Sequence, residues 1–379
     1  LSDVVVVKFQ FLLLIFLIIM NKLICLFYTV FLFFTIHSQT DNNVKNILKE
    51  FKYSSDSFFV GGTLFNFQLN TEIENIFLEE FNYLTPANSF KQTVIHPKPD
   101  VWRWERYNNF INFANENNLT LRVHGPISPQ ASKWVKDDVR TKEELSLILE
   151  EFFTELCKKV NKESSVRWMD VVNETVLRNG SWFAEKPGTD KWENPWTQIG
   201  INDDGFPKYI VRAFEIANKH ATNIKLVYNH NGGMEKVMWE KIMETITYLK
   251  SKGLRIDAIG WQAHLRTNSL SKEDLQYLDF LIDWAHKNNL EFHITELNLW
   301  VKEETPNLDS IQNIQAELYK KIIDKMISKK NNGVVALNFW GIKDRKEPNK
   351  INKNILSIYD QSLHSNPGLN TIKRSLKSK

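Results

Sequence analysis

The sequence predicts a single-domain α/β protein folded as a closed (β/α)8 barrel, the TIM-barrel architecture. Eight short apolar runs recur along the chain, and each ends in polar residues or glycine. Segments with apolar residues at helical spacing lie between these runs. After residue 50 no linker rich in Pro, Ser or Thr interrupts the alternation, although the chain has 379 residues. Eight alternating strands and helices in one domain favour a parallel barrel covered by helices.

The predicted strands cover residues 58–65, 83–85, 119–125, 166–174, 224–231, 255–264, 290–298 and 333–341. The clearest helix covers residues 272–289, with an apolar stripe of Leu275, Leu278, Ile282 and Ala285. Another helix begins after Thr141, whose spacing from Glu144 fits a capping box. An open doubly wound sheet is the alternative fold. It usually has a Gly-rich phosphate turn after its first strand, whereas "VGGTLF" keeps both glycines inside a strand-like run.

Residues 1–38 are expected to lie outside the fold, with residues 1–19 as an upstream extension. From Met20 onwards the chain has the pattern of a secretory signal peptide: Lys22, an apolar run over 23–36, and Ser38 before Gln39. We therefore expect a mature chain that begins near residue 39 and is secreted, periplasmic or on the cell surface. A membrane anchor is the alternative, but the apolar runs fall short of the ~20 residues that a span needs.

The charge balance indicates no nucleic-acid partner, because 48 Lys and Arg residues nearly match 45 Asp and Glu residues and form no basic stripe. We expect the catalytic domain to cover 39–370 and the basic residues 371–379 to form a solvated tail. Of the two cysteines, Cys25 lies in the signal segment, and Cys157 is expected to be a packed thiol. No histidine spacing predicts a metal site. We expect a monomer that needs no cofactor.

Polar residues follow the predicted strands at the point where each strand ends. The active site of a (β/α)8 barrel lies at the C-terminal ends of its strands. From the second strand to the eighth, these ends carry Asn88 and Lys91, His124 and Gln130, Asn173 and Glu174, Asn229, His230 and Asn231, Gln262 and His264, Glu296 and Asn298, and Trp340 and Asp344. We expect them to form one polar rim.

Two of these residues are glutamates that follow long apolar runs, Glu174 after "DVVN" and Glu296 after "FHIT". A carboxylate there is costly to bury unless it is partnered or used. Two carboxylates across a barrel mouth are the groups that glycoside hydrolysis needs. One gives a proton to the leaving oxygen, and the other attacks the sugar carbon or activates water. The alternative is a pair of unrelated glutamates, each in its own salt bridge.

Four motifs at these strand ends, "DVVNE", "GWQAHL", "ITELN" and "NFWGIKD", resemble in their order those of glycoside hydrolase family 10, the retaining endo-β-1,4-xylanases. The resemblance extends from about Asn88 to Asp344. It implies a (β/α)8 barrel that hydrolyses internal bonds of xylan with retention of configuration, through a covalent glycosyl-enzyme. Glu174 would then be the acid/base and Glu296 the nucleophile.

The resemblance also implies roles for substrate-binding residues. Asn173 would donate a hydrogen bond to the sugar 2-hydroxyl rather than carry a glycan on its N-x-T sequon. His264 would hydrogen-bond Glu296 and keep it ionised. Gln262, at the end of the sixth strand, is another expected substrate-binding residue. The glycone-side sugar contacts would be Asn88, Lys91, His124, Gln130 and the stacking ring of Trp340.

The chain also departs from the family pattern. Ala87 stands where the family has Glu, His230 and Asn231 replace acidic and tyrosine positions, and two tryptophans are missing, one after His124 and one after Asp344. We expect a thinner glycone-side wall. Three tryptophans in the loop after the fourth strand, Trp182, Trp192 and Trp196, either offer compensating stacking faces for sugars or are packing residues. Two other functions are considered: a related two-glutamate glycosidase acting on glucan, mannan or a decorated hemicellulose, and a non-catalytic carbohydrate-binding barrel.

Overall fold

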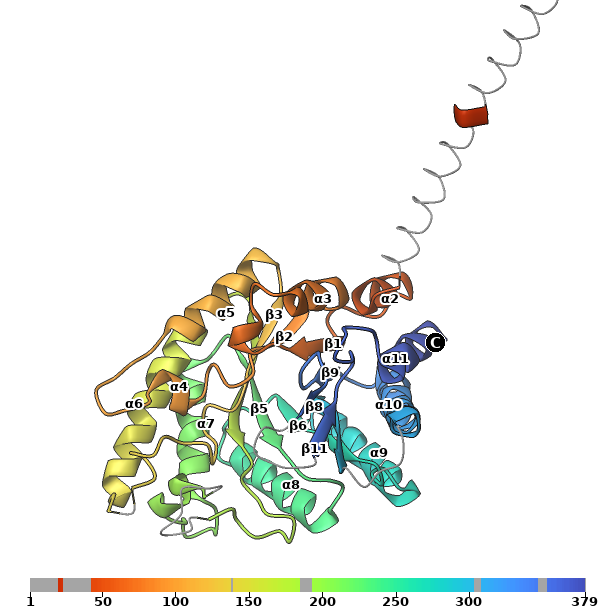
Figure 1. Ribbon diagram of the computed structural model, residues 1–379. Coiled ribbons are helices and arrows are strands. Elements are labelled where there is room, and N and C mark those ends of the chain that lie inside the picture. Colours follow the sequence, from red (N-terminus) through yellow and green to blue (C-terminus); the bar gives the residue numbers. More distant parts are fainter. Residues whose placement is uncertain are drawn as a thin grey trace, which may run out of the picture.

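The computed structural model describes residues 20–22, 42–137, 139–184, 193–302, 308–346 and 353–378. These residues form a closed barrel of parallel strands with helices around it (Figure 1). The predicted (β/α)8 barrel is therefore confirmed. The signal segment that we predict over 1–38 lies outside the described residues, apart from residues 20–22. Within the described part of the chain, none of the helices combines the length and the apolar character needed to cross a membrane.

The barrel consists of eight strands, each hydrogen-bonded to the next in parallel. They are β1 (Phe58–Thr63), β2 (Tyr83–Thr85), β3 (Thr120–Val123), β4 (Val166–Asn173), β5 (Lys225–His230), β6 (Ala258–Trp261), β8 (Glu291–Lys302) and β9 (Val335–Phe339). The barrel closes where β9 pairs with β1, with Phe58 opposite Val335. All eight predicted strands are present, with ends that differ by a few residues from the predicted ones.

Three short strands extend the sheet beyond the mouth of the barrel. They are β7 (His264–Arg266), which pairs in parallel with the end of β8, and the antiparallel pair β10 (Arg345–Lys346) and β11 (Lys353–Leu356). The predicted sixth strand, 255–264, is thus wrong in its bounds, because it divides between β6 and β7. The division lies at Gln262 and Ala263, and Ala263 has a φ of 56°, which no strand accommodates.

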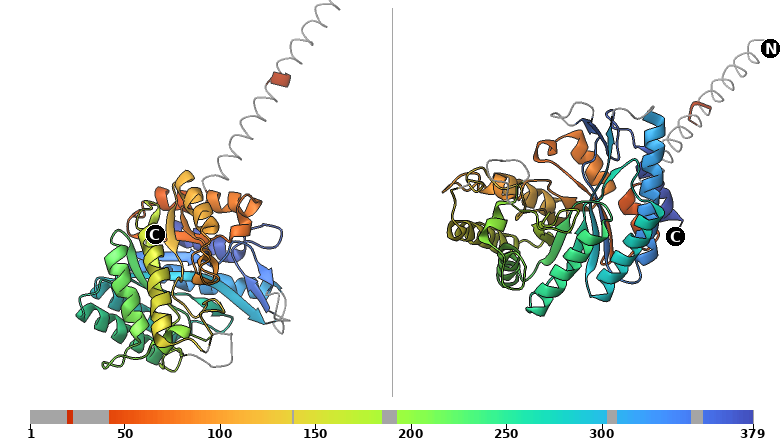
Figure 2. Two further views of the ribbon diagram at one scale, coloured as in Figure 1. Left: turned by 90° about the vertical axis from the view of Figure 1, so that its left-hand side faces the viewer. Right: turned by 90° about the horizontal axis from the view of Figure 1, so that it is seen from below.

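Helices enclose the strands in all three views (Figures 1 and 2). They are α2 (Val44–Glu50), α3 (Glu72–Glu80), α4 (Gln92–Ile95), α5 (Glu105–Glu116), α6 (Lys142–Val160), α7 (Lys208–His220), α8 (Lys236–Ser251), α9 (Lys272–Lys287), α10 (Leu308–Lys329) and α11 (Pro367–Lys377), with 3-10 turns η1 (Asn66–Gln68) and η2 (Pro195–Ile199). The predicted capping box of α6 is confirmed, since the Thr141 hydroxyl accepts the Glu144 N–H at 3.1 Å. Cys157 is buried in α6, as predicted.

Inside the barrel, the side chains form an apolar floor beneath a polar layer. Aromatic and small side chains from six strands meet in the floor: Phe59, Tyr83, Trp168, Val227, Ala258 and Ala336. The ring centroids of Phe59 and Trp168 lie 4.8 Å apart in an edge-to-face arrangement. Above them lie the buried polar side chains of Arg122, Asp170, Asn229 and Thr295. The floor fills the barrel beneath the polar layer, and the cavity described below lies on the other side of that layer.

The predicted solvated tail is wrong. Residues 371–377 belong to α11, which packs against α10 and α2. Leu369, Ile372 and Leu376 are fully buried, and the Lys373 ammonium lies 2.5 Å from a Glu80 carboxylate oxygen. Apolar residues lie at helical spacing among the charged residues of this segment, and they form the buried face of α11. The domain therefore continues beyond residue 370.

Candidate active site

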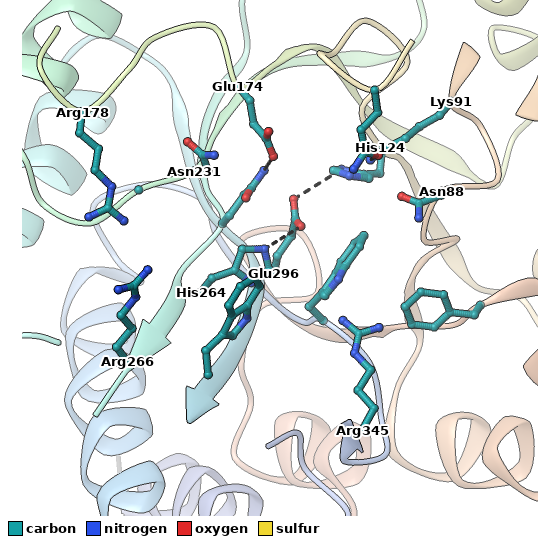
Figure 3. Close-up of a pocket in the computed structure, with 16 residues that line it drawn as sticks. Asn88, Lys91, His124, Glu174, Arg178, Asn231, His264, Arg266, Glu296 and Arg345 are labelled. Atoms are coloured by element: carbon teal, nitrogen blue, oxygen red, sulfur yellow. Dashed lines mark hydrogen bonds and ion pairs between the residues drawn. The ribbon is translucent and has the colours of Figure 1, made fainter. Parts of the chain in front are cut away.

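A cavity of about 570 Å³ opens at the C-terminal ends of the barrel strands and contains both glutamates (Figure 3). Nearly all of the side chains predicted for the site line it: Glu174, Glu296, Asn88, Lys91, His124, Gln130, Gln262, His264 and Trp340. Asn173 lies just beneath the cavity, with 2% of its surface exposed. The polar residues that follow separate strands are therefore brought together at one place.

Glu296 lies within β8 and is held from three directions. Its Oε1 accepts a hydrogen bond from the Asn229 amide at 3.2 Å and lies 3.6 Å from His124 Nδ1, and its Oε2 lies 3.3 Å from His264 Nε2. Burial raises the pKa of this carboxyl, because only 3% of Glu296 is exposed. His124, His264 and Lys91 outweigh burial and lower the pKa to about 2. Glu296 is therefore an ionised and immobile carboxylate.

Glu174 occupies a turn directly after β4. Its φ of 59° is in the left-handed region, which a residue with a side chain adopts only at some cost. The backbone N–H of Glu174 donates to the carbonyl of Asn229 at 3.3 Å. Its Oε1 accepts a hydrogen bond from the Gln262 amide at 2.8 Å, and the side chain points into the cavity (Figure 3). The turn ends the buried strand and directs the carboxylate toward Glu296.

Three amide side chains link the two glutamates. The Asn229 amide donates to Asn173 Oδ1 at 2.8 Å, and the Gln262 amide donates to the same oxygen at 3.1 Å. Thr295 fixes the orientation of Asn229 by donating to its Oδ1 at 2.8 Å. Because the oxygen of Asn173 already accepts two hydrogen bonds, its NH2 group is the part that remains to donate to a ligand.

A buried chain of charges lies below His124. The Arg122 guanidinium contacts both carboxylate oxygens of Asp170 at 2.6 Å, and Asp170 Oδ2 lies 2.9 Å from His124 Nδ1. All three side chains are at most 1% exposed. Such charge-assisted contacts are short and directional, so they hold the imidazole in a fixed orientation beside Glu296.

Comparison with known proteins identifies the family. The family model of glycosyl hydrolase family 10 matches residues 50–375. Endo-1,4-beta-xylanase A of Caldicellulosiruptor saccharolyticus is 31% identical over 306 residues, which is 78% of this chain and 84% of that protein. The chain belongs to glycosyl hydrolase family 10. It is a glycoside hydrolase, and the family predicted from the four sequence motifs is confirmed.

Solved structures of similar proteins share the fold of this family 10 hydrolase. The endo-1,4-beta-xylanase of Caldicellulosiruptor owensensis is 25% identical, with a TM-score of 0.72 over 87% of this chain and 99% of that one. The native xylanase 10B of Thermotoga maritima, 23% identical, has a TM-score of 0.74 over 89% and 98% of the two chains. Both agree with a single (β/α)8 domain.

One wall of the cavity in this family 10 hydrolase is built from largely buried groups. Lys91 is 3% exposed and its ammonium donates a hydrogen bond to Gln130 Oε1. Burial lowers the pKa of Lys91, while Glu174, Glu296 and Asp170 oppose this change. Trp340 packs edge-to-face on His124, with ring centroids 5.1 Å apart. Asn88 is exposed at the rim on the same side (Figure 3).

Three residues of the predicted polar rim, His230, Asn298 and Asp344, do not line the cavity, and Asn229 lies beneath it beside Asn173. Asn298 is fully buried, and its Oδ1 lies 2.9 Å from His264 Nδ1. His230 is completely buried and packs edge-on against Trp239, because neighbouring residues of a strand point to opposite faces. Asp344 turns away, and its Oδ1 accepts hydrogen bonds from the Ser357 N–H at 2.6 Å and the Asn366 amide at 3.0 Å. Burial raises the pKa of Asp344 to about 6.

The two described tryptophans after the fourth strand, Trp182 and Trp196, pack against other residues of the domain. Trp196 is fully buried, and its indole N–H donates to the carbonyl of Ser128 at 3.1 Å. Trp182 packs on Phe206, and the Lys241 ammonium lies 5.0 Å from its ring centroid. Trp192 lies outside the described residues. Of the two alternatives that the sequence leaves open, packing therefore holds for Trp182 and Trp196.

Several cavity residues are not predicted by the sequence. They are Phe65, Arg178, Arg266, Trp300 and Arg345. Each lies in a loop or an extension strand outside the eight barrel strands or at the end of one, where side-chain direction depends on tertiary contacts. The nearest available signal is spacing: Arg178 follows Glu174 by four residues and Arg266 follows His264 by two. Neither spacing alone distinguishes a cavity residue from a solvated one.

Proposed function

We propose that this family 10 hydrolase is a secreted endo-β-1,4-xylanase that acts with retention of configuration. The relatives whose names state an activity support the substrate: endo-1,4-beta-xylanase A of Caldicellulosiruptor saccharolyticus, and the beta-1,4-xylanase of Dictyoglomus thermophilum, 28% identical over 76% of this chain and 78% of that one. The observation that carries the mechanism is the unequal support of the two glutamates. Glu296 is fixed and ionised, whereas within the described part of the chain the Glu174 carboxylate accepts one hydrogen bond, from Gln262.

In the first step, Glu296 attacks the anomeric carbon of the sugar and forms a covalent ester. The glycosidic bond breaks, and the Glu174 carboxyl gives its proton to the departing oxygen. A nucleophile has to be ionised before it attacks, and the low pKa of Glu296 fits this requirement. The hydrogen bonds from Asn229 and His264 support the role, because they keep the attacking carboxylate in one orientation.

In the second step, Glu174 is a carboxylate and removes a proton from water. The resulting nucleophile attacks the anomeric carbon, releases Glu296 and restores the starting protonation states. Asn173 would donate from its NH2 group to the sugar 2-hydroxyl, a contact that strengthens in the transition state. His124, Lys91, Gln130, Asn88 and Trp340 would bind the glycone sugars, as the family resemblance implies.

Proton NMR of freshly released sugar tests the mechanism. Two successive inversions at one carbon give net retention, so the β-anomer is expected first and the α-anomer only after mutarotation. Initial α-anomer would mean that water attacks directly and that Glu296 is a general base. A panel of xylan, β-glucan and mannan tests the substrate, with release of reducing ends expected from xylan.

Export is a separate part of the proposal and is supported by the signal-peptide pattern from Met20 to Ser38. N-terminal sequencing of protein recovered outside the cell is expected to begin at Gln39. A mature protein that begins upstream of Met20 would contradict both the cleavage site and the assignment of residues 1–19.

A further inference from the structure

Two arginines outside the proposed catalytic groups face each other across one end of the cavity. Arg178 lies in the turn after β4, and Arg266 ends β7. Their guanidinium groups point toward one another on the side of the glutamates away from Asn88 and Lys91 (Figure 3). Since those two residues match glycone positions, the arginines lie on the side of the leaving group.

Each arginine is positioned by its own element. The turn of Arg178 is fixed by hydrogen bonds from the Leu177 N–H to the Ser181 carbonyl at 2.7 Å and from the Gly180 N–H to the Leu177 carbonyl at 2.9 Å. Arg266 lies opposite Trp300 in the pairing of β7 with β8. Its backbone N–H donates to the Ser269 hydroxyl at 2.8 Å. Both side chains therefore extend from anchored backbone.

The two guanidinium groups differ in how far their charges are balanced. Arg178 forms an ion pair with Glu235 at 2.9 Å, and its side chain is 64% exposed. Among the described residues, no carboxylate forms an ion pair with Arg266, which is also exposed. Like charges that face each other repel, so this end of the cavity has a positive potential that a bound anion would relieve.

Among the described residues, the cavity lining combines Lys91, Arg178 and Arg266 with the carboxylates of Glu174 and Glu296. A second cavity of about 440 Å³ shares Arg178 and Arg266 with the first one, so the arginines stand where the two meet. A neutral sugar chain would offer no counter-charge to Arg266, which has no carboxylate partner among the described residues.

The carboxylates of the second cavity are already engaged. Glu235 pairs with Arg178 and also accepts the Gly233 N–H at 2.7 Å. Asp274 accepts the Ser271 N–H at 2.9 Å, in the capping box at the start of α9. Neither carboxylate is placed as a partner of Arg266, so the charge of Arg266 remains available to a ligand.

We infer that Arg178 and Arg266 bind a carboxylate of the substrate on the leaving-group side of the glutamates. The planar guanidinium matches a carboxylate with paired hydrogen bonds, and a carboxylate between the two groups replaces their repulsion with attraction. In a xylan substrate this carboxylate belongs to a uronic acid side group. The inference rests on the proposed xylanase function and adds a preference for acidic xylan.

The test compares kcat/KM on a glucuronate-substituted xylan with kcat/KM on the same xylan after reduction of its carboxyl groups. Reduction keeps the side group and removes only its charge. The wild-type enzyme is expected to prefer the acidic form. Arg266→Gln should lower kcat/KM on the acidic form roughly three- to fivefold, as for an exposed ion pair, and leave the reduced form nearly unchanged. Removal of both arginines should cost about tenfold on the acidic form.

Two further measurements separate charge from shape. Arg266→Lys keeps the charge but loses the paired hydrogen bonds, so its preference for the acidic form should lie between those of the wild-type enzyme and Arg266→Gln. Raising the ionic strength from about 0.01 M to 1 M shortens the Debye length from about 30 Å to 3 Å and should reduce the preference of the wild-type enzyme.

Arg106→Gln is the matched control, because Arg106 is an exposed arginine on α5 outside both cavities. This variant should leave kcat/KM unchanged on both the acidic and the reduced xylan.

Equal cleavage of the acidic and reduced xylans by the wild-type enzyme would overturn the inference. An equal loss on both substrates in Arg266→Gln would also overturn it, because the arginine would then contact the neutral chain. Failure of the proposed function is distinguishable from these results. An enzyme that releases no reducing ends from the carboxyl-reduced xylan is no general xylanase, whatever its arginines bind.

Discussion

Glu296 and Glu174 have different surroundings, although two carboxylates with interchangeable roles would be expected to have similar ones. Glu296 lies inside a barrel strand, is nearly inaccessible to water and contacts Asn229, His124 and His264. Glu174 follows a strand in a strained turn, and the Gln262 amide is the one side chain that hydrogen-bonds its carboxylate among the described residues. The difference indicates that a fold can separate the duties of two identical residues. One carboxylate is fixed in its ionised form by several neighbours, and the other is held by a single amide among the described residues.

The strongest test of this comparison is removal of Glu296. Glu296→Ala should lower kcat by roughly 10⁴-fold or more on every substrate, because in the proposed mechanism Glu296 forms the covalent intermediate. Aryl xylobiosides with good leaving groups should be affected as strongly as xylan. Azide should restore at most an α-configured product from an activated β-glycoside. Thermal unfolding of the variant serves as the control for folding.

Removal of Glu174 should have a smaller and more selective effect. Glu174→Ala should lower xylan cleavage by roughly 10² to 10⁴-fold, the usual contribution of general acid–base catalysis. Formation of the glycosyl-enzyme from aryl xylobiosides should be spared, because their leaving groups need little proton assistance. Azide should restore turnover and give a β-configured glycosyl azide. If the products of the two alanine variants are interchanged, the assignments of nucleophile and acid/base are reversed.

Asn229 is connected to both glutamates. Its amide donates directly to Glu296 and also to Asn173 Oδ1, which Gln262 links to Glu174. Asn229→Ala should lower kcat/KM by about 10- to 100-fold, as expected for a lost hydrogen bond to a charged group. Because that hydrogen bond favours the ionised carboxylate, its loss should also raise the pKa of Glu296. The acidic limb of the pH–rate profile should move upward if this pKa comes to control it. If the variant loses kcat/KM because it no longer folds, Asn229 has only a structural role.

The smallest effect is expected for a substitution of Asp344. Comparing this buried carboxyl with Glu296 tests whether the cationic neighbours of Glu296, rather than burial, give it a low pKa. Burial raises the pKa of Asp344 to about 6, whereas histidines and a lysine lower that of Glu296. The folded pKa of Asp344 exceeds the unfolded value of about 4, so its contribution to stability is complete below about pH 4. That contribution is lost as the pH rises through 6, by about 1 to 3 kcal/mol.

Asp344→Asn should therefore be more stable, relative to the wild-type enzyme, at pH 7 than at pH 4. Denaturant unfolding at the two pH values measures this difference. The asparagine keeps an oxygen that can accept the hydrogen bonds from Ser357 and Asn366, so packing should change little. An unchanged difference between the two proteins at pH 4 and pH 7 would show that burial does not control this carboxyl.

The sequence alone predicted the barrel strands and most of the site, for a physical reason. Residues such as Glu174 and Glu296 follow apolar runs, and the parallel register of a barrel brings the ends of those runs to one mouth. The same reasoning identified Gln262 and His264, although their strand is divided. The arrangement of strands, rather than any loop, fixes where these side chains lie.

The remaining features depend on contacts between distant parts of the chain. His230 follows the same apolar run as Asn229, and only the alternation of the strand turns it away from the cavity. Arg178 and Arg266 are placed by a turn and by an extension strand whose conformations no local pattern specifies. In α11, the basic residues around Ile372 predicted a segment exposed to solvent. The buried face of this helix is recognised only from its packing against α10 and α2.

The position of α11 has a consequence for how the protein folds. Tyr53 donates from its hydroxyl to the Leu376 carbonyl at 3.0 Å, and Lys377 reaches Asn42 at 2.9 Å. The seam between β1 and β9 is likewise formed by strands from near the two ends of the domain. Contacts of such high sequence separation are slow to form, and during synthesis they have to wait for the last helix. Barrel closure at this seam is therefore expected to be a late step, and the emerging chain exposes the apolar edge of β1 until then.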